Sequence, residues 1–577
     1  MGSCAKVDAP GGAHDHKLIL LILLVALASP VFGQQESADD GRLAAAQKAF
    51  DSGQFDEAAR LSQGPGGQSA KLDFLRGLAL ARKQQWGESR QAFRAGQLKS
   101  PGDPRFLVEL AGVDYKQNHF SAAERNLRAA LRLGSRDSYT FDFLGTIYFL
   151  QGNVEAALKY WNRIEKPRLR NVGVQPPPRL NATLVDRAIT YNAPQVLTGD
   201  ALLLTRGRLE NLGVFPRQRI ELAPSGEHFD AKVHLAERNG WGDSKPEGAI
   251  ALLSGVAYAT VYPELYNIGH HAVNFTSLLR WDSEKRRAFG AVSTPLFENP
   301  ARRLQAYFDG RNENWNLSET FFSSGPAVTD LNMRRLAGGI ELRSVAGARW
   351  SWSTGVEVAN RSFRNLGGIS SAGEMVFFTD STSFAYWLGA KRSILRVPEH
   401  RFTLDTGVEG RIGRAFAANL GAFGTARGLL DAHWLPRATG DDYEIRARIR
   451  AGATAGDVPL DELFQLGVER DNDLWMRGHA GTSSGRKGAA PLGRRYFLAN
   501  WEVDKNVYSN GLFSVKLGPF VDSGKITDGS GLFGSREWLV DTGAQCKVRV
   551  LGSVTVVLIY GRDLRGGHNV FYPTAVH

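Results

Sequence analysis

The residues best suited to charge chemistry lie near the C-terminus, in a polar, glycine-rich segment between two stretches that alternate like β-strands. They are Met476, Arg477, Gly478 and His479. A buried arginine without a counter-charge is costly, so Arg477 needs acidic partners. In the next two stretches, Glu502 and Asp522 fall on the charged face, opposite a run of apolar residues. We expect Arg477 to pair with these two carboxylates. Gly478 would let the segment turn with a positive φ or pass close to a neighbouring wall.

Other motifs that could support catalysis or cofactor binding are weak. His270 and His271 are adjacent, so in a strand they would point to opposite faces, which suits a single metal poorly. The stretch "GTSSGRKG" lacks the spacing and the Lys-Ser/Thr end of a phosphate-binding loop. The sequence therefore predicts no enzymatic activity, no cofactor and no metal.

The segment around Arg477 is flanked by long stretches with a period of two. "YEIRARIRAGA", "RRLQAYFDGRNE" and "RFTLDTGVEGRIG" each place apolar residues on one face and charged residues on the other. A soluble β-sandwich also alternates. These strands, however, are about ten residues or longer, and arginines lie beside carboxylates along one face. Both features favour a transmembrane antiparallel β-barrel over residues 245–577. About fifteen candidate strands are visible, and bacterial barrels have even numbers, so we expect about sixteen.

A helical repeat precedes this region, over residues 41–166. Four turn-and-helix units recur at intervals of 31, 34 and 34 residues. Their bulky and small positions include Phe55, Ala58, Trp86, Ser89, Phe120, Ala123 and Ala157. A period of 34 with a small residue at the helix contact is typical of tetratricopeptide (TPR) repeats. The alternative is a generic helical bundle. A TPR solenoid implies a concave surface for a protein or peptide partner.

A proline-rich segment and a small module separate the helices from the alternating region. Residues 167–181 include three consecutive prolines and are expected to form a stiff linker. Residues 182–240 read as a helix ending near Gly213, followed by two short strands. They resemble a POTRA domain, a periplasmic module of outer-membrane barrels, at positions Arg208, Leu209, Leu212, Gly213, Phe215 and Glu237. In that family the module offers a strand edge to passing chains. The alternative is a plain α+β domain.

The N-terminus and the composition bear on the compartment. Lys17 precedes an apolar run from Leu18 to Ala28, with small residues before a cleavage point after Gly33, so residues 1–33 are predicted to be a signal peptide. A membrane anchor is the alternative, but the run is about half the roughly 20 residues that a spanning helix needs. The net charge of +11 is spread over most of the chain, which disfavours a nucleic-acid partner.

The region 180–577 resembles the outer-membrane protein assembly factor superfamily, of the BamA and TamA type, which also includes two-partner secretion transporters. The matching residues are "FQLGVERDNDLWMRG", "PFVDSG" and "VDTGAQCKVRVLGSVTVVLIYGRDL". In that family a loop with an Arg-Gly core enters the barrel and its arginine pairs with carboxylates on the next strands. Here Val468 replaces a glycine of the motif and His479 replaces an aromatic residue.

This resemblance implies a multidomain protein: an all-α TPR solenoid, a small α+β POTRA domain and an outer-membrane barrel. The expected partners are outer-membrane lipid, unfolded or extended polypeptide clients, and a periplasmic protein on the TPR surface. The barrel would insert or translocate polypeptides. The main alternative is a passive pore or surface-binding protein with a periplasmic scaffold. A third reading is a soluble TPR adaptor with a β-sandwich.

Overall fold

A computed structural model describes residues 29–64, 69–318, 328–367, 376–417, 420–437, 440–529, 533–535, 537–550 and 554–576. Most of the predicted signal peptide lies outside these residues. The chain divides into two compact units, residues 1–147 and 148–577. None of the described helices is both long and apolar enough to cross a bilayer.

The first unit is built from helix pairs. Their bounds are α2 (Ser29–Asp51), α3 (Phe55–Leu61), α4 (Ala70–Arg82), α5 (Trp86–Lys99), α6 (Pro104–Lys116), α7 (Phe120–Arg132) and α8 (Ser138–Leu150), and α9 (Val154–Trp161) follows in the second unit. The bulky residues at the 34-residue period each open the second helix of a pair. The small residues Ala58, Ser89, Ala123 and Ala157 are all fully buried.

Glycines bring the helices of this unit close together. A Cβ at Gly77 would lie 2.4 Å from the Phe93 ring, and one at Gly96 would lie 2.3 Å from the Phe106 ring. The hydroxyl of Ser89 donates to the Gly77 carbonyl at 2.8 Å. Small residues are therefore required where these helices touch, and this accounts for the repeated small position in the sequence.

After α9, the second unit continues with a small module of three strands and two helices. It contains β1 (Leu169–Gln175), α10 (Ala182–Ala188), α11 (Gly199–Leu212), β2 (Arg217–Ser225) and β3 (His228–Ala236). The strand order is β1-β3-β2, with β1 parallel and β2 antiparallel to β3. Leu209, Leu212 and Phe215 lie in its core.

The expected linker at residues 167–181 is wrong in its first half, because residues 169–175 form β1. Leu169 is fully buried in the module core, and Val172 and Val174 pack against the same core. The prolines at 176–178 end this strand rather than a helix, since proline cannot donate to a strand ladder.

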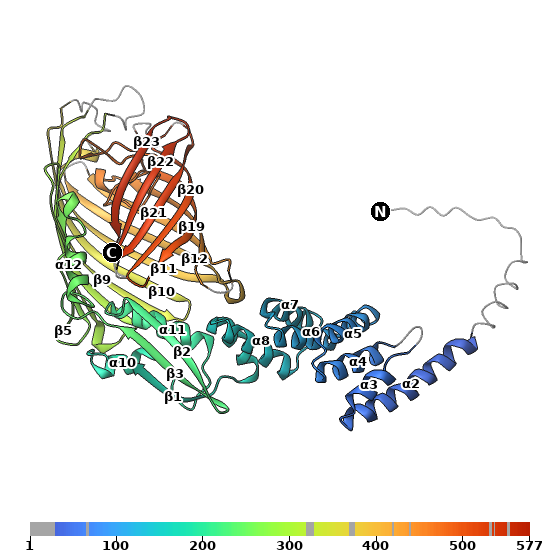
Figure 1. The fold of residues 1–577 in the computed structure, drawn as a ribbon. Helices are drawn as coiled ribbons and strands as arrows, with labels where there is room; N and C mark the ends of the chain where they lie inside the picture. Colours follow the sequence, from blue (N-terminus) through green and yellow to red (C-terminus); the bar gives the residue numbers. More distant parts are fainter. Residues whose placement is uncertain are drawn as a thin grey trace, which may run out of the picture. The chain divides into compact units, whose positions relative to one another are not determined.

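The rest of the second unit is one large antiparallel sheet that curls round on itself (Figure 1). Its strands are β4 (Thr260–Val261), β5 (Glu264–Ile268), β6 (Val273–Trp281), β7 (Lys285–Pro295), β8 (Arg302–Trp315), β9 (Leu331–Gly347), β10 (Trp350–Arg364), β11 (Ser381–Val397), β12 (Phe402–Ala417), β13 (Leu420–Trp434), β14 (Tyr443–Gly456), β19 (Arg495–Ser509), β20 (Phe513–Thr527), β21 (Leu539–Val550), β22 (Val554–Asp563) and β23 (Asn569–Val576). Most are 12 to 17 residues long, as the alternating pattern predicts.

The two ends of this sheet meet at a seam. Paired registers join each neighbouring pair from β6 to β14 and from β19 to β23, and β14 pairs with β19. The strand order brings β23 next to β4. Within the described residues, however, no paired register joins β23 to β4 or β5. The two edge strands therefore lack a hydrogen-bonded ladder between them along this seam.

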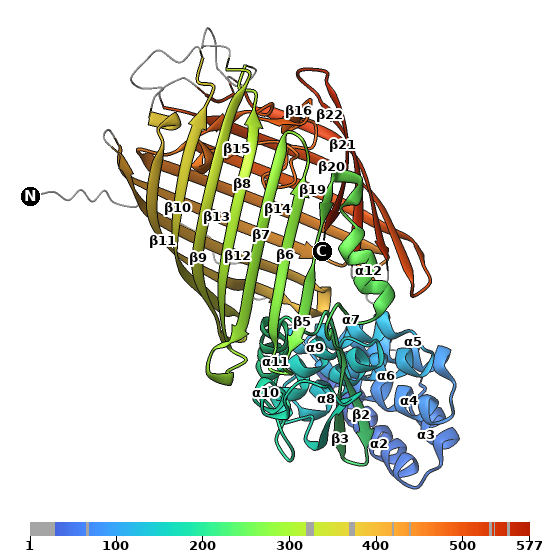
Figure 2. The same ribbon diagram turned by 90° about the vertical axis from the view of Figure 1, so that its left-hand side faces the viewer.

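The strand count differs from the expectation of about sixteen. β4 and β5 both pair with β6 and share one strand position, so the described sheet has fifteen positions. Residues 245–259, placed at the start of the predicted barrel, instead form α12 (Lys245–Leu253) and a short 3-10 turn. The Ser244 side chain caps this helix by accepting from the Glu247 N–H, and Pro246 sits in its first turn. Figure 2 shows α12 along the edge of the sheet, between β5 and the C-terminal strands.

Candidate functional site: an ion-paired loop inside the curved sheet

The segment that contains Arg477 is the long connection between β14 and β19. It folds on itself through the short pairs β15 (Phe464–Gln465) with β18 (Leu492–Gly493), and β16 (Thr482–Ser483) with β17 (Arg486–Lys487). The side-chain amide of Asn472 donates to the carbonyls of Gln465 and Gly467 at 2.9 and 2.8 Å. The loop therefore has its own internal structure.

Met476 anchors the loop to the sheet. It is fully buried in an apolar cluster with Leu474 of the loop and with Leu498 and Ile526 of the strands. A Cβ at Gly524 would lie 3.1 Å from the Met476 sulfur. The glycine thus leaves room for this side chain against β20.

Arg477 meets both of the carboxylates expected from the sequence. Its Nε and Nη2 donate to Asp522 at 2.9 and 2.6 Å, in a two-pronged pair. Its Nη1 donates to Glu502 at 3.0 Å. The residue is 4 % exposed and Asp522 is fully buried. Bidentate arginine–carboxylate pairs are among the strongest side-chain contacts, so this arrangement holds the loop tip firmly.

Two further contacts of Arg477 were missed by sequence reasoning. The Gln545 side-chain oxygen accepts from Nη1 at 2.9 Å. The guanidinium carbon also lies 3.8 Å from the centre of the Phe520 ring, a cation–π contact. The inward position of Gln545 in a period-two strand could have indicated the first contact, but its height relative to Arg477 depends on strand register.

Gly478 passes close to the wall, as expected, but without a positive φ. Its N–H donates to Asp541 at 2.5 Å. A Cβ here would lie 2.6 Å from the Asp563 backbone nitrogen. On the facing strand, a Cβ at Gly561 would lie 2.0 Å from the Arg477 carbonyl oxygen. A pair of glycines thus allows the loop backbone and β22 to touch.

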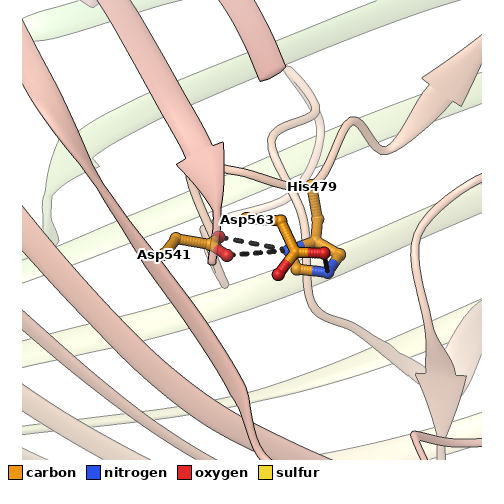
Figure 3. Close-up of side chains that lie close together, drawn as sticks. All are labelled: His479, Asp541 and Asp563. Carbon is orange, nitrogen blue, oxygen red and sulfur yellow. Dashed lines mark hydrogen bonds and ion pairs between the residues drawn. The ribbon is translucent and has the colours of Figure 1, made fainter. Parts of the chain in front are cut away.

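His479 lies between two aspartates from neighbouring strands (Figure 3). Its Nδ1 is 3.1 Å from Asp541 and its Nε2 is 3.6 Å from Asp563. Asp541 and Asp563 face each other in the register of β21 and β22. The sequence predicts no partner for His479, because Asp541 and Asp563 were noted only as members of the long C-terminal stretch that carries the family resemblance.

These three side chains are also of types that bind metals, and one ligand atom from each lies within 4.8 Å of the others. The geometry favours a different function. A metal needs one imidazole nitrogen and both carboxylates directed at a common point, whereas here each nitrogen faces a different carboxylate. A protonated imidazole that bridges two carboxylates has this arrangement. The absence of a metal stays a prediction.

The loop also contacts the opposite wall of the sheet, through acidic side chains. Asp471 pairs with Arg280 and Arg287, both at 2.7 Å. Asp461 pairs with Arg335 at 2.9 Å and with Arg361 at 2.5 Å. The further ion pairs of this kind are Glu462 with Arg361 and Arg411, and Glu469 with Lys285. These loop acids were not identified from the sequence, because their partners lie about 50 to 190 residues away on other strands.

The loop is matched to both walls by charge. Its acids meet arginines of the wall formed by β6 to β12, and its Arg477 and His479 meet carboxylates of the wall formed by β19 to β22. Such complementarity fixes the orientation of the loop as well as its position.

The small module is fastened to one end of the sheet. Glu237 accepts from the backbone N–H groups of Arg179 and Leu180 at 2.7 and 2.8 Å, and from the Asn267 side chain at 2.9 Å. Gly213 ends α11 with a φ of 72°. A Cβ on it would lie 2.4 Å from the Arg303 guanidinium of β8. Arg208 donates to the Arg187 carbonyl at 2.9 Å within the module.

A second contact joins α9 to the turn between β11 and β12. Glu399 of this turn accepts a hydrogen bond from the Tyr160 hydroxyl at 2.7 Å and forms an ion pair with the Lys159 ammonium at 2.6 Å. Burial of Glu399 opposes its ionisation, but these two donors outweigh burial and lower the pKa of the carboxyl below its usual range. The turn is thus held to the helix by an ionised carboxylate.

The solved structures that are similar in fold include three proteins that match over 71 % of this chain. They are BamA from Haemophilus ducreyi lacking POTRA domains 1–3 (12 % identity, 84 % of that chain, TM-score 0.43), CdiB from Escherichia coli (12 %, 75 %, 0.44) and CdiB from Acinetobacter baumannii (13 %, 74 %, 0.41). MamA is similar over 23 % of this chain and 80 % of its own, at 14 % identity and a TM-score of 0.21. No family model and no curated protein matches the sequence.

Proposed function

We propose that this chain is an outer-membrane barrel that inserts polypeptides into the outer membrane or translocates them across it. The helical repeats would be TPR units and the β1–β3 module a POTRA domain, and both would receive the client in the periplasm. The observation that carries the proposal is the loop held by Arg477 inside a sheet of long strands, whose first and last strands share no paired register within the described residues.

The outward face of the sheet supports a position in a membrane. Large apolar side chains on this face are strongly exposed, including Val408 at 61 %, Ile412 at 67 % and Trp501 at 52 %. On the alternate positions, Asp309, Glu357 and Asp522 are almost completely buried. Apolar side chains facing lipid and paired charges facing inward are what a spanning barrel requires. A soluble sheet would bury its apolar face instead.

The seam supports a role in handling extended chains. An edge strand carries unpaired N–H and C=O groups that a client strand can bind. The β1–β3 module adds two more edges, because its strand order leaves β1 and β2 on the outside. Transfer of a client strand from one edge to another would need no nucleotide, since pairing and burial of apolar surface provide the free energy.

Two experiments test this proposal. Depletion of the protein in its host should remove particular proteins from the outer membrane or the cell surface, as measured by quantitative proteomics of membrane fractions. In planar bilayers, the purified protein should show low, flickering conductance that Arg477→Ala increases, whereas Arg437→Ala, at an exposed ion pair with Asp442, should leave it unchanged. An unaltered membrane proteome, with steady large openings that do not respond to Arg477→Ala, would favour the passive pore.

A further inference from the structure

Consecutive arginines in β7 and β9 have opposite environments. Arg287 and Arg335 point inward: Arg287 pairs with Asp309 at 2.9 Å, and Arg335 pairs with Glu357 at 2.7 Å. Their neighbours Arg286 and Arg334 point outward and are exposed. Within the described part of the chain, neither of these two outward arginines has a hydrogen bond or an ion pair. The inward charges are matched with acids, while the outward pair is left for something outside the chain.

The two outward arginines belong to one row across four strands. The register places Arg286 opposite Asn312, Asn312 opposite Arg334, and Arg334 opposite Ser362. Neighbouring strands are about 4.8 Å apart, so the two arginine backbones are about 10 Å apart. The row contributes to the lining of a shallow surface depression of about 580 Å³. Two long, flexible arginine side chains at this separation can converge on one anionic group.

The row marks the boundary between an apolar and a polar zone. Toward the middle of the strands, the same depression is lined by Leu279, Phe308 and Leu336, which are 45 %, 46 % and 54 % exposed. The row lies near the strand ends that are opposite to the β7–β8 turn. That turn holds the small module, through the hydrogen bond from Asn211 to the Pro300 carbonyl at 2.9 Å. The arginines therefore lie at the end of the apolar band that is farther from the small module.

We propose that this row binds the phosphate groups of an anionic lipid in the outward-facing leaflet, with the acyl chains on the apolar residues below. This inference rests on the proposed function only in taking the sheet to span the outer membrane. Arginine forks match phosphate oxygens in a two-pronged geometry, and Asn312 and Ser362 add neutral polar groups between and beside them. Free phosphate would use the arginines alone, whereas a lipid also covers Leu336 and Phe308. The apolar floor of the depression therefore favours a lipid.

The test uses the full chain, purified in an uncharged detergent and titrated with defined ligands in native mass spectrometry. We expect binding of diphosphoryl lipid A, much weaker binding of phosphatidylcholine, and little competition by inorganic phosphate. The double variant R286Q/R334Q should weaken lipid A binding by about tenfold or more for each arginine. The matched control is R302Q, because Arg302 is an exposed arginine of β8 at the opposite end of the strand.

Equal binding of lipid A by R286Q/R334Q and by the unmodified protein would overturn the inference, as would equal binding of phosphatidylcholine. Displacement of lipid A by millimolar inorganic phosphate would reassign the row to free anions and would overturn it too. Circular dichroism and heat-dependent mobility on gels check that the variants are folded, which is expected because neither arginine side chain forms a hydrogen bond or an ion pair with a described residue. Subcellular fractionation separates this outcome from failure of the proposed function. It shows whether the protein lies in the outer membrane, regardless of whether the purified protein binds lipid in detergent.

Discussion

The two acidic partners of Arg477 contribute unequally. Asp522 is fully buried and accepts four hydrogen bonds, from the N–H, Nε and Nη2 of Arg477 and from Asn500. The Glu502 side chain is 19 % exposed and also binds Lys547. Removing one partner of a buried ion pair leaves an uncompensated charge, which is far more costly than losing a partly hydrated contact.

We therefore expect Asp522→Asn to destabilise the sheet by about 3–5 kcal/mol and Glu502→Gln by about 1–2 kcal/mol. The measurement is the temperature at which the folded band on a denaturing gel converts to the unfolded band. Asp442→Asn, at the exposed pair with Arg437, is the control and should change little. A larger effect of Glu502→Gln than of Asp522→Asn would contradict this ranking.

The close approach of the loop to β22 depends on Gly561. An added Cβ there would meet the Arg477 carbonyl oxygen at 2.0 Å, so Gly561→Ala must move either the loop or the strand. We expect faster hydrogen exchange and easier proteolysis across residues 470–485, with the sheet itself intact. Gly410→Ala is the matched control, because a Cβ at Gly410 in β12 has no atom within 4 Å. Equal protection of the loop in both variants would show that the contact is unimportant.

At the scale of elements, the alternation of residues predicts most of the sheet but not its beginning. Period two predicts one face for Asp522 and Glu502, because the side-chain direction in a strand follows from local geometry alone. It could not place α12, because residues 245–259 are apolar enough for a strand and only the cap at Ser244 indicates a helix. It also missed β1, whose parallel partner β3 lies about sixty residues away. The ion pairs of Asp461 and Asp471 depend on register across many strands, and a single sequence carries no signal for this.

The junction between the small module and the sheet should depend on Gly213. Both Gly213 and Gly226 have a positive φ, so alanine at either position costs about 1–2 kcal/mol from backbone strain. Only at Gly213 would the new Cβ also meet the Arg303 guanidinium, at 2.4 Å. We expect Gly213→Ala to increase hydrogen exchange in the β7–β8 turn and to lower stability more than Gly226→Ala does. Equal effects of the two variants would place the cost in the backbone alone.

The contact of α9 with the β11–β12 turn should depend on pH. The pKa of Glu399 is lowered by Lys159 and Tyr160, so its contribution to stability is present above the pKa of an unperturbed glutamate, about 4.3. It is lost as the pH falls through the lower pKa of the folded state. We expect the protection factors of the amides in the turn, which are corrected for the intrinsic pH dependence of exchange, to fall on acidification in the unmodified protein. In Glu399→Gln they should be low already and less dependent on pH.

At the scale of the whole molecule, the loop spans the interior between two walls and pairs with opposite signs of charge on them. Asp471 holds it to the arginines of β6 and β7, and Arg477 holds it to the carboxylates of β19 and β20. Because the two attachments lie on opposite sides, the loss of either one leaves the other to keep the loop inside. This arrangement predicts a conductance that responds to the two attachments together rather than to each alone.

We expect Asp471→Asn and Arg477→Gln, each alone, to produce brief openings in planar bilayers, and the double variant to produce long openings of larger conductance than the two single effects combined. The physical reason is that each cluster alone retains several ion pairs and hydrogen bonds within a buried site, so release of the loop needs both to fail. Non-additive behaviour of this kind is the signature of residues that act on one element. Full opening in either single variant would mean that one wall alone holds the loop, and a closed double variant would mean that the apolar cluster around Met476 holds it instead.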